Sequence, residues 1–366
     1  MSKTLIALTI SILWPFSIKC QSLLNKTFES VSSFEKSDVI TSPKDLLQIS
    51  KNAQNYLKNK KAKTDNQIKS ILFKDRQTYL ASTQNTLSSL ISILKTNPET
   101  QINQDVLNQH FRYIKWNGNT EVALKNKVYI PNGKIRLTKY LVFRISGSYV
   151  KTNKFSCALY DVPKDEQQLS EKEILNKKNS LIRFKYTKQD VLSDALEKSQ
   201  NKRLVKPLVW LTREDLEEAI MQGTTIVQTP DNKKHIFNVH KSNEIPYDKK
   251  LKSKILQKRY WYFKEVSGFQ GYGKDFASRI QIIPEVTFAG DVHKLGVGTI
   301  IAIVYNNPKT FKKESRIGII ADCGGAFENN LYQLDYFVGA FKSREDFKNK
   351  IVMLPEMVDA YILVKK

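Results

Sequence analysis

The sequence predicts a two-domain protein that is mainly β, with a helical region toward its N-terminal end. The chain has 366 residues, and one domain per roughly 150 residues suggests two domains. Up to about residue 115, apolar residues recur at helical spacing, whereas short runs of β-branched and aromatic residues follow Trp116. This change of pattern predicts N-terminal helices followed by β-structure of a barrel-like kind.

Within the helical region, two sets of apolar residues have the spacing of one helix face. They are Leu46, Leu47, Ile49 and Leu57, and then Leu87, Leu90, Ile91, Ile93 and Leu94. Ser42 followed by Pro43 is typical of a helix N-terminus, because Ser caps free backbone N–H groups and Pro is tolerated in the first turn.

The later part of the chain contains runs that are typical of strands. They are Val128–Ile130, Tyr140–Phe143, Thr225–Val227, Ile236–Val239 and Thr299–Tyr305. One helix is expected among them over Arg213–Met221, because Thr212 and Asp215 have the spacing of an N-terminal capping box. No repeat of 20 to 50 residues is visible, which argues against a repeat protein.

The charge of the chain predicts an anionic partner. With 59 basic and 36 acidic residues the formal net charge is +23, and apolar residues make up 41%. This composition excludes a protein with many membrane spans and a disordered chain. It leaves nucleic acid, an acidic membrane surface or an acidic polymer such as a cell wall as partners.

The first 22 residues have the pattern of a secretory signal. Lys3 precedes an apolar stretch, Leu5–Phe16, that is short for a membrane-spanning helix. Two alternatives stay open for its processing: lipid attachment at Cys20, or cleavage after Ser22 to give a soluble exported protein. In both cases we expect an exported protein, in the periplasm, and with the lipid an outer-membrane lipoprotein. Export argues against nucleic acid as the partner.

Several familiar chemistries lack support in the sequence. Three cysteines are too few for a disulfide framework and too scattered for a zinc site. The four histidines have no ligand spacing, and no G-x-S-x-G motif is present. Gly268–Lys274 has phosphate-loop spacing, but Asp275 follows where Ser or Thr should hold magnesium. We therefore expect no metal and no cofactor.

Two aspartates are the candidates for acid–base chemistry. Asp322 is followed by Gly324 and Gly325, and Asp335 precedes Tyr336; each aspartate stands at the edge of an apolar run. Partial burial there raises a carboxyl pKa and keeps a proton available for general-acid catalysis. On spacing alone, the alternative that Asp322 caps a turn and Asp335 ends a surface strand is favoured.

These two segments resemble a known family. Asp-x-Gly-Gly-Ala at Asp322 and Asp-hydrophobic-aromatic-x-Gly at Asp335 are similar to the three-aspartate domain of the membrane-bound lytic murein transglycosylase A (MltA) family. Further motifs follow the family's order, and the resemblance covers roughly residues 40–366. They lie at Thr138–Tyr140, Leu211–Arg213, Met221–Thr225, Asn243–Tyr247 and Tyr260–Glu265.

The resemblance implies a fold and its domain boundaries. Residues 23–143 and 250–366 would form a double-psi β-barrel domain that includes the N-terminal helices. Residues 144–249 would form a smaller inserted β-domain, with a glycan-binding groove between the two.

The resemblance also implies an activity and the residues that carry it. The enzyme would break the β-1,4 bond between N-acetylmuramic acid and N-acetylglucosamine of murein and leave a 1,6-anhydro end. Asp335 would be the catalytic acid and base, and Asp322 would orient the groups around it. The expected glycan contacts are Gln222, Gly223, Thr224, Tyr140 and Thr138.

The sequence departs from the family at the first of the three aspartates, where Pro284 and Glu285 stand instead. Glu285, or alternatively Asp291, is the candidate for this role. The departure also keeps a second function open, a non-catalytic murein-binding or cell-wall remodelling protein of the same fold. The partner would be murein in either case, and we expect a monomer.

Overall fold

The computed structural model describes residues 27–96 and 102–366. The predicted signal segment, residues 1–22 with Cys20, lies outside the described residues. Within the described ranges, no helix has the length and apolar character needed to cross a membrane.

Six strands follow one another in a closed ring of backbone pairings. β14 pairs with β11, then β12, β10, β13 and β4 follow in turn, and β4 pairs back with β14. The β10–β12 and β13–β4 pairs are parallel and the other four are antiparallel. The ring strands are β4 (Ile135–Ser146), β10 (Thr287–Ala289), β11 (Ile300–Asn306), β12 (Lys313–Asp322), β13 (Gln333–Phe341) and β14 (Met357–Lys365).

Shorter elements extend this ring. Three further strands pair with β14 and β12 or with each other: β1 (Phe28–Val31), β2 (Asp38–Val39) and β3 (Phe111–Trp116). The helices outside the insert are α2 (Pro43–Lys58), α3 (Lys60–Lys63), α4 (Arg76–Thr96), α5 (Gln104–His110), α6 (Thr120–Lys125) and α12 (Arg344–Ile351). Two single turns of 3₁₀ helix are η3 (Phe276–Ser278) and η4 (Gly325–Phe327).

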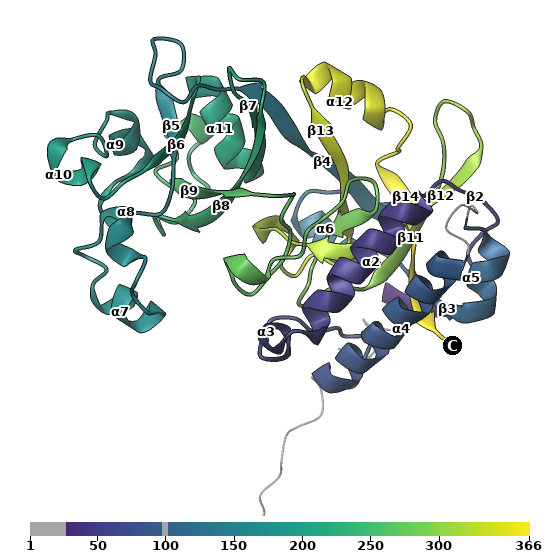
Figure 1. Ribbon diagram of the computed structural model, residues 1–366. Helices are drawn as coiled ribbons and strands as arrows, with labels where there is room; N and C mark the ends of the chain where they lie inside the picture. Colours follow the sequence, from purple (N-terminus) through teal and green to yellow (C-terminus); the bar gives the residue numbers. More distant parts are fainter. Residues whose placement is uncertain (1–26, 97–101) are drawn as a thin grey trace, which may run out of the picture.

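The two long N-terminal helices pack side by side against the ring (Figure 1). α2 begins where the sequence predicts, since the Ser42 side chain accepts a hydrogen bond from the Asp45 N–H and Pro43 occupies the first turn. Leu46 and Leu57 of α2 and Leu90 of α4 are fully buried in the same core as the ring strands. The predicted helical region is therefore confirmed.

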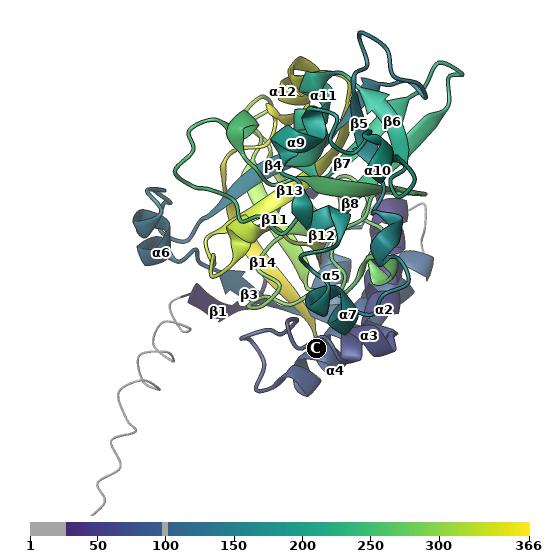
Figure 2. The same cartoon turned by 90° about the vertical axis from the view of Figure 1, so that its left-hand side faces the viewer.

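Residues between β4 and the ring's later strands form a separate part of the molecule, which lies beside the ring in Figure 1 and in front of it in Figure 2. Its strands are β5 (Cys157–Tyr160), β6 (Pro207–Leu211), β7 (Thr224–Gln228), β8 (Lys234–Ser242) and β9 (Trp261–Val266). Its helices are η1 (Lys164–Glu166), α7 (Glu171–Asn176), α8 (Ile182–Lys185), α9 (Lys188–Leu192), α10 (Ser199–Lys202), α11 (Arg213–Gln222) and η2 (Lys254–Leu256). This insert contains more helix than the small β-domain that the resemblance implies.

The insert has hydrophobic cores of its own. The β5–β6 pair separates two of them, because successive side chains of a strand point to opposite faces. Ala158 and Tyr160 pack in one core, whereas Leu159 packs in the other with Val209 of β6. These cores also contain Tyr262 and Phe263 of β9, which lie beyond the predicted boundary at residue 249. The division at residues 144 and 249 stays a prediction.

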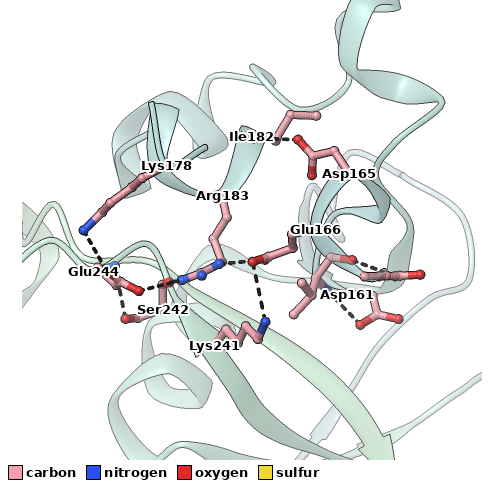
Figure 3. A network of polar contacts seen from close by, with 11 residues as sticks. Asp161, Asp165, Glu166, Lys178, Ile182, Arg183, Lys241, Ser242 and Glu244 are labelled. Carbon is pink, nitrogen blue, oxygen red and sulfur yellow. Dashed lines mark hydrogen bonds and ion pairs between the residues drawn. The ribbon is translucent and has the colours of Figure 1, made fainter. Parts of the chain in front are cut away.

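A buried ion pair ties the insert's helical loops to β8 (Figure 3). Arg183 and Glu166 are 4% and 1% exposed, and Arg183 Nε donates to Glu166 Oε1 at 2.6 Å. Arg183 Nη1 also donates to the Ser242 carbonyl at 2.5 Å and pairs with Glu244 at 3.3 Å. Such a charge is tolerated in a core only when its hydrogen bonds are made, so the network fixes the chain at the end of β8.

Four of the five predicted strand runs are confirmed, within β4, β7, β8 and β11. The strand predicted at Val128–Ile130 is wrong, since this segment is irregular. Ile130 is buried against Ala123 and Tyr332 in a small satellite core, whereas Tyr129 is 76% exposed. The apolar residues of this run therefore pack a loop, and Pro131 directly after them cannot donate to a sheet.

Candidate active site

The two candidate aspartates lie on neighbouring strands around one residue of β10. Asp322 ends β12, Asp335 is near the start of β13, and both are in register with Ala289. β10 lies between β12 and β13, so Asp322 and Asp335 lie on either side of this short strand. The register explains why both carboxyl groups share one environment.

Asp322 accepts hydrogen bonds that favour its ionised form. The Tyr140 hydroxyl donates to Oδ2 at 2.9 Å, and the Cys323 backbone N–H donates to Oδ1 at 2.8 Å. Burial raises the pKa of Asp322 to about 6, while these two hydrogen bonds and the charge of Arg279 act in the opposite direction. Asp322 is therefore a partly buried acid whose carboxylate has three stabilising neighbours.

Asp335 lies in a setting that favours its protonated form. It stands between the fully buried Leu334 and Tyr336, and its Oδ1 is buried without a hydrogen-bond partner among the described residues. The pKa of Asp335 is raised to about 6, mainly by burial and also by the neighbouring charge of Asp322. The Thr138 hydroxyl and the Lys139 ammonium act in the opposite direction.

The pKa of both carboxyl groups is raised to about 6, and their hydrogen bonds distinguish them. When two like charges are close, the carboxyl with more hydrogen-bond donors ionises first and the other keeps its proton. Asp322 has the Tyr140 and Cys323 donors, and Asp335 has an unpaired oxygen. The arrangement can therefore supply a proton from Asp335 beside an ionised Asp322.

A cavity of about 450 Å³ opens next to this pair, between the insert and the ring. Cys323 and Gly324, directly after Asp322, line it on the ring side, and Gln222 and Gly223 line it on the insert side. The volume is within the range of small-molecule binding sites. The Gln222 side chain makes no hydrogen bond within the described part of the chain, so its amide is available to a ligand.

Gly223 shapes the insert side of this cavity. The α11 helix is capped by Thr212 as predicted and ends at Gln222, and Gly223 follows with φ 75°. This left-handed conformation favours glycine and is typical of helix C-termini. It turns the chain directly from α11 into β7, which leaves the Gln222–Gly223 corner exposed to the cavity.

Three of the predicted glycan-contact residues make contacts within the protein. The Thr224 hydroxyl bonds to Asn238, and the Thr138 hydroxyl donates to the Leu334 carbonyl at 3.1 Å. The Tyr140 hydroxyl is used by Asp322, and its ring stacks on Phe337 with 5.0 Å between centroids. The structure thus brings Gln222 and Gly223 to the cavity surface, whereas Thr138, Thr224 and Tyr140 are not among the residues that line it.

Arg279 links the insert to the carboxylate pair and was not predicted from the sequence. Its Nη1 donates to the Val239 carbonyl at 2.6 Å and to the Asn238 side chain, both on β8. Its charge also acts on Asp322. A basic residue directly before the apolar run Ile280–Ile283 was the signal that could have identified it, because a charge beside buried residues usually has a partner.

The two candidates for the missing first aspartate lie on either side of β10, and the Glu285 N–H donates to the Phe337 carbonyl at 2.7 Å. Glu285 pairs with Lys350 and, at 3.5 Å, with Arg316. Asp291 is 2% exposed and follows the segment whose Gly290 N–H donates to the Asp322 carbonyl at 3.3 Å. The structure does not bring the Glu285 carboxylate to Asp322 or Asp335 through any contact.

The described ranges contain no group of three or more His, Cys, Asp or Glu side chains suited to a metal ion. Cys157 and Cys323 are free thiols in the structure.

The fold and site together define a mainly β protein with a cavity between its insert and its ring of strands, and with two partly buried carboxyl groups next to that cavity. Residues 136–261 match the family model described as the MltA specific insert domain. A search of curated proteins finds no match.

Solved structures share the fold at low sequence identity. The chain is similar to a membrane-bound lytic murein transglycosylase from Agrobacterium tumefaciens, with 12% identity, 93% and 98% of the two chains covered, and a TM-score of 0.59. It is also similar to E. coli MltA with bound chitohexaose, with 10% identity, 93% and 94% covered, and a TM-score of 0.60. MltA from Neisseria gonorrhoeae gives 15% identity, 87% and 88% covered, and a TM-score of 0.54.

The insert-domain match and the shared fold confirm the resemblance to the MltA family that the sequence motifs indicate. The family model matches the insert region alone, within a mainly β fold that also contains helices.

Proposed function

We propose that the protein is a lytic transglycosylase that cleaves the β-1,4 bond between N-acetylmuramic acid and N-acetylglucosamine in murein. The observation that carries the proposal is the carboxyl pair: Asp335 has a raised pKa and an unpaired oxygen, beside a hydrogen-bonded Asp322. The relatives that share the fold are named as lytic murein transglycosylases, which supports the same class of reaction.

The proposed mechanism uses Asp335 twice. Its carboxyl proton passes to the glycosidic oxygen as the bond from that oxygen to C1 breaks. The C6 hydroxyl of the same muramyl residue then attacks C1, and its proton passes to the Asp335 carboxylate. Because the sugar supplies the nucleophile, neither water nor a second carboxylate nucleophile is consumed, in contrast to ordinary glycosidases.

The neighbours of Asp335 would support this cycle. The ionised Asp322, held by Tyr140, would stabilise positive charge that develops on the sugar ring. Gln222 and the backbone at Gly223 would bind the glycan in the groove. Thr138, Thr224 and Tyr140 would hold the residues behind this surface in place, a more indirect role than direct contact with sugar.

The finer points of fold and location are part of the same proposal. The closed ring of six strands, with two parallel pairs, would be a double-psi β-barrel. The exported protein would work in the periplasm as a monomer, anchored to the outer membrane by a lipid on Cys20. Murein carries carboxylates, which suit a chain with a net charge of +23.

Digestion of purified sacculi, with mass spectrometry of the released fragments, tests the reaction. The proposal expects 1,6-anhydro ends, lighter by one water than hydrolysed ends. Hydrolysed reducing ends would contradict the mechanism. If the wild-type chain binds sacculi but releases nothing, the non-catalytic murein-binding protein becomes the better explanation.

A further inference from the structure

The insert side of the groove carries positive charge that the protein itself does not neutralise. Four ionisable side chains line the cavity there, Lys188, Glu217, Lys254 and Arg259. Lys188 is 1% exposed and pairs with Glu217 at 2.6 Å. Across the described ranges, neither Lys254 nor Arg259 forms an ion pair with a carboxylate, so the cavity retains two cationic groups.

Aromatic rings hold Arg259 in place. Its guanidinium carbon lies 5.7 Å from the centroid of Trp261 and 6.0 Å from that of Tyr247, and its Nε donates to the Ile245 carbonyl at 3.1 Å. Both rings also line the cavity. The terminal nitrogens make no hydrogen bond within the part of the chain that the structure describes, so they are available to an acceptor in the groove.

Lys254 and Arg259 belong to the loop formed by residues 243–260, and hydrogen bonds join the two ends of this loop. The buried Asn243 donates to the Lys258 carbonyl at 3.1 Å and accepts from the Tyr260 N–H at 3.0 Å. Further in, the Gln257 amide bonds to both the N–H and the carbonyl of Asp248, at 2.9 and 2.8 Å.

Two further contacts fix this loop. The buried ammonium of Lys188 donates to the Lys254 carbonyl at 3.2 Å. At the start of the loop, the Arg183 network holds Ser242 and Glu244 (Figure 3). The cations are therefore presented by an ordered backbone, which lowers the entropic cost of binding a ligand.

The insert side of the groove offers cationic and aromatic groups to a ligand, in contrast to the ring side at Gly324. A guanidinium is planar and matches a carboxylate with two parallel hydrogen bonds, and a nearby ammonium adds attraction. Tyr247 and Trp261 offer apolar faces to a sugar ring. A ligand that combines a sugar with a carboxylate fits this surface better than a neutral glycan does.

We propose that Arg259 and Lys254 form an anion subsite that binds a carboxylate carried by the N-acetylmuramic acid residues of the substrate. The carboxylate belongs either to the lactyl group or to the attached stem peptide. This inference rests on the proposed function and specifies its substrate preference. The subsite selects carboxylate-bearing murein over neutral N-acetylglucosamine polymers, which offer no partner for the two cations.

Binding is measured in an Asp335→Asn background, so that the result does not depend on turnover. Three ligands separate the sources of charge: chitohexaose, which is neutral; murein glycan oligomers stripped of peptide, which carry free lactyl carboxylates; and peptide-bearing oligomers. The double substitution Arg259→Gln with Lys254→Gln should raise the Kd for a carboxylate-bearing ligand by about tenfold or more. The Kd for chitohexaose should stay within about twofold.

The matched control is Lys249→Gln with Lys252→Gln, which removes the same charge from exposed positions of the same loop. It should leave all three Kd values within about twofold. Lys254→Glu alone, at an exposed position, should also weaken binding of the charged ligand and tests the subsite without altering the Arg259 contacts. If the double substitution weakens binding of the peptide-bearing oligomer, the carboxylate belongs to the stem peptide. If it weakens binding of the stripped oligomers alone, the carboxylate belongs to the lactyl group.

The proposal is overturned if chitohexaose binding falls equally or if the control pair has the same effect. It is also overturned if the Asp335→Asn protein with no further substitution does not bind the carboxylated ligands more tightly than chitohexaose. Failure of the proposed reaction shows separately, as absence of release from sacculi by the wild-type chain.

Discussion

The Tyr140 hydroxyl donates a hydrogen bond of 2.9 Å to Oδ2 of Asp322, although 182 residues separate them in the sequence. The contact joins β4, where the chain leaves for the insert, to the end of β12 in the ring. It also favours the ionised form of a carboxyl whose pKa is raised to about 6 by burial. Tyr140 therefore helps to set the protonation of the site.

Tyr140→Phe should move the acid limb of the pH–rate profile to higher pH. Without the hydroxyl, ionised Asp322 loses a charge-assisted hydrogen bond, so its pKa rises and a higher pH is needed to ionise it. A hydrogen bond to a charged group contributes about 1.5–3 kcal/mol, which corresponds to a shift of about one unit or more. The kcat/KM on soluble glycan strands, measured across pH 4–8, checks the shift.

The control for this change is Tyr149→Phe. Tyr149 also has a hydrogen-bonded hydroxyl, 3.0 Å from His235 Nε2, but it lies in the insert away from the carboxyl pair. Its profile should match the wild type. An unchanged acid limb in Tyr140→Phe would remove Asp322 ionisation from the mechanism.

Asp335 should make the protein less stable as the pH rises through the range in which it ionises. Its pKa of about 6 in the folded protein exceeds the ordinary value near 4. A folded state that holds the proton more tightly loses stability between about pH 4 and pH 6 as the pH rises. At pH 7 the folded protein then carries a poorly solvated carboxylate.

Asp335→Asn should therefore be more stable than the wild type at pH 7, by about 2–3 kcal/mol in the free energy of unfolding. At pH 4 or below the two should be equal. Urea unfolding at both pH values measures this difference. The control is Asp231→Asn: hydrogen bonds from Thr229 hold the pKa of Asp231 low, so its loss should destabilise the protein at pH 7. Equal stability of Asp335→Asn and wild type at pH 7 would contradict the raised pKa.

Local signals in the sequence predicted local structure well. Ser42 and Thr212 cap helices as expected, because an N-cap uses side chains within three residues of each other. The strand predicted at Val128–Ile130 failed because a three-residue apolar run does not reveal whether it has a strand partner. Such partners are set by residues elsewhere in the chain.

In the candidate site, too, local motifs were predicted from the sequence whereas contacts between distant residues were not. Asp322 and Asp335 were found from their motifs, but their shared register with Ala289 comes from strand pairing that spacing does not encode. Arg279 and Arg259 were missed because their partners lie about 14 to 40 residues away. Thr224 matched a motif, yet its hydroxyl is used inside the protein, because a motif does not specify which way a side chain turns.

Asp291 and Glu285 should differ in their effect on turnover. Asp291 Oδ1 accepts from the His293 N–H at 3.0 Å and so fixes the turn after β10, next to the Gly290–Asp322 contact. Asp291→Asn should lower kcat by about tenfold, since small displacements of reacting groups are costly. Glu285→Gln should leave kcat within about twofold, because Lys350 and Arg316 hold its carboxylate elsewhere.

The same sacculus digestion serves both variants, with thermal unfolding to establish that each is folded. A large loss with Glu285→Gln and none with Asp291→Asn would reverse the assignment and make Glu285 the stand-in for the missing aspartate.

Cys20→Ala should release the protein from the membrane fraction, because a lipid on this cysteine would be the anchor. Fractionation of cells, together with the intact mass of the mature N-terminal peptide, measures the outcome. Ser22→Ala is the matched control and should not alter the distribution. An unchanged membrane yield for Cys20→Ala, with no lipid mass on the wild type, would favour cleavage after Ser22.

Asp335→Asn should abolish release of murein fragments while binding to sacculi is retained. Asparagine has nearly the shape of aspartate but can neither donate an acidic proton nor accept one from the C6 hydroxyl. Loss of a positioned acid or base typically lowers the rate by about 10²–10⁴-fold, and here one group performs both steps. Asp322→Asn should have a smaller effect, since its proposed role is to stabilise charge and orient its neighbours.

Time courses of fragment release and sedimentation of the protein with sacculi measure these two properties separately. Asp231→Asn, which removes a carboxylate from the surface of the insert, is the control and should release fragments at the wild-type rate. If Asp335→Asn still produces 1,6-anhydro ends at a comparable rate while Asp322→Asn does not, the roles of the two carboxyl groups are exchanged. That outcome would place the transferable proton on the residue with more hydrogen-bond donors, against the electrostatic argument from which the pair was assigned.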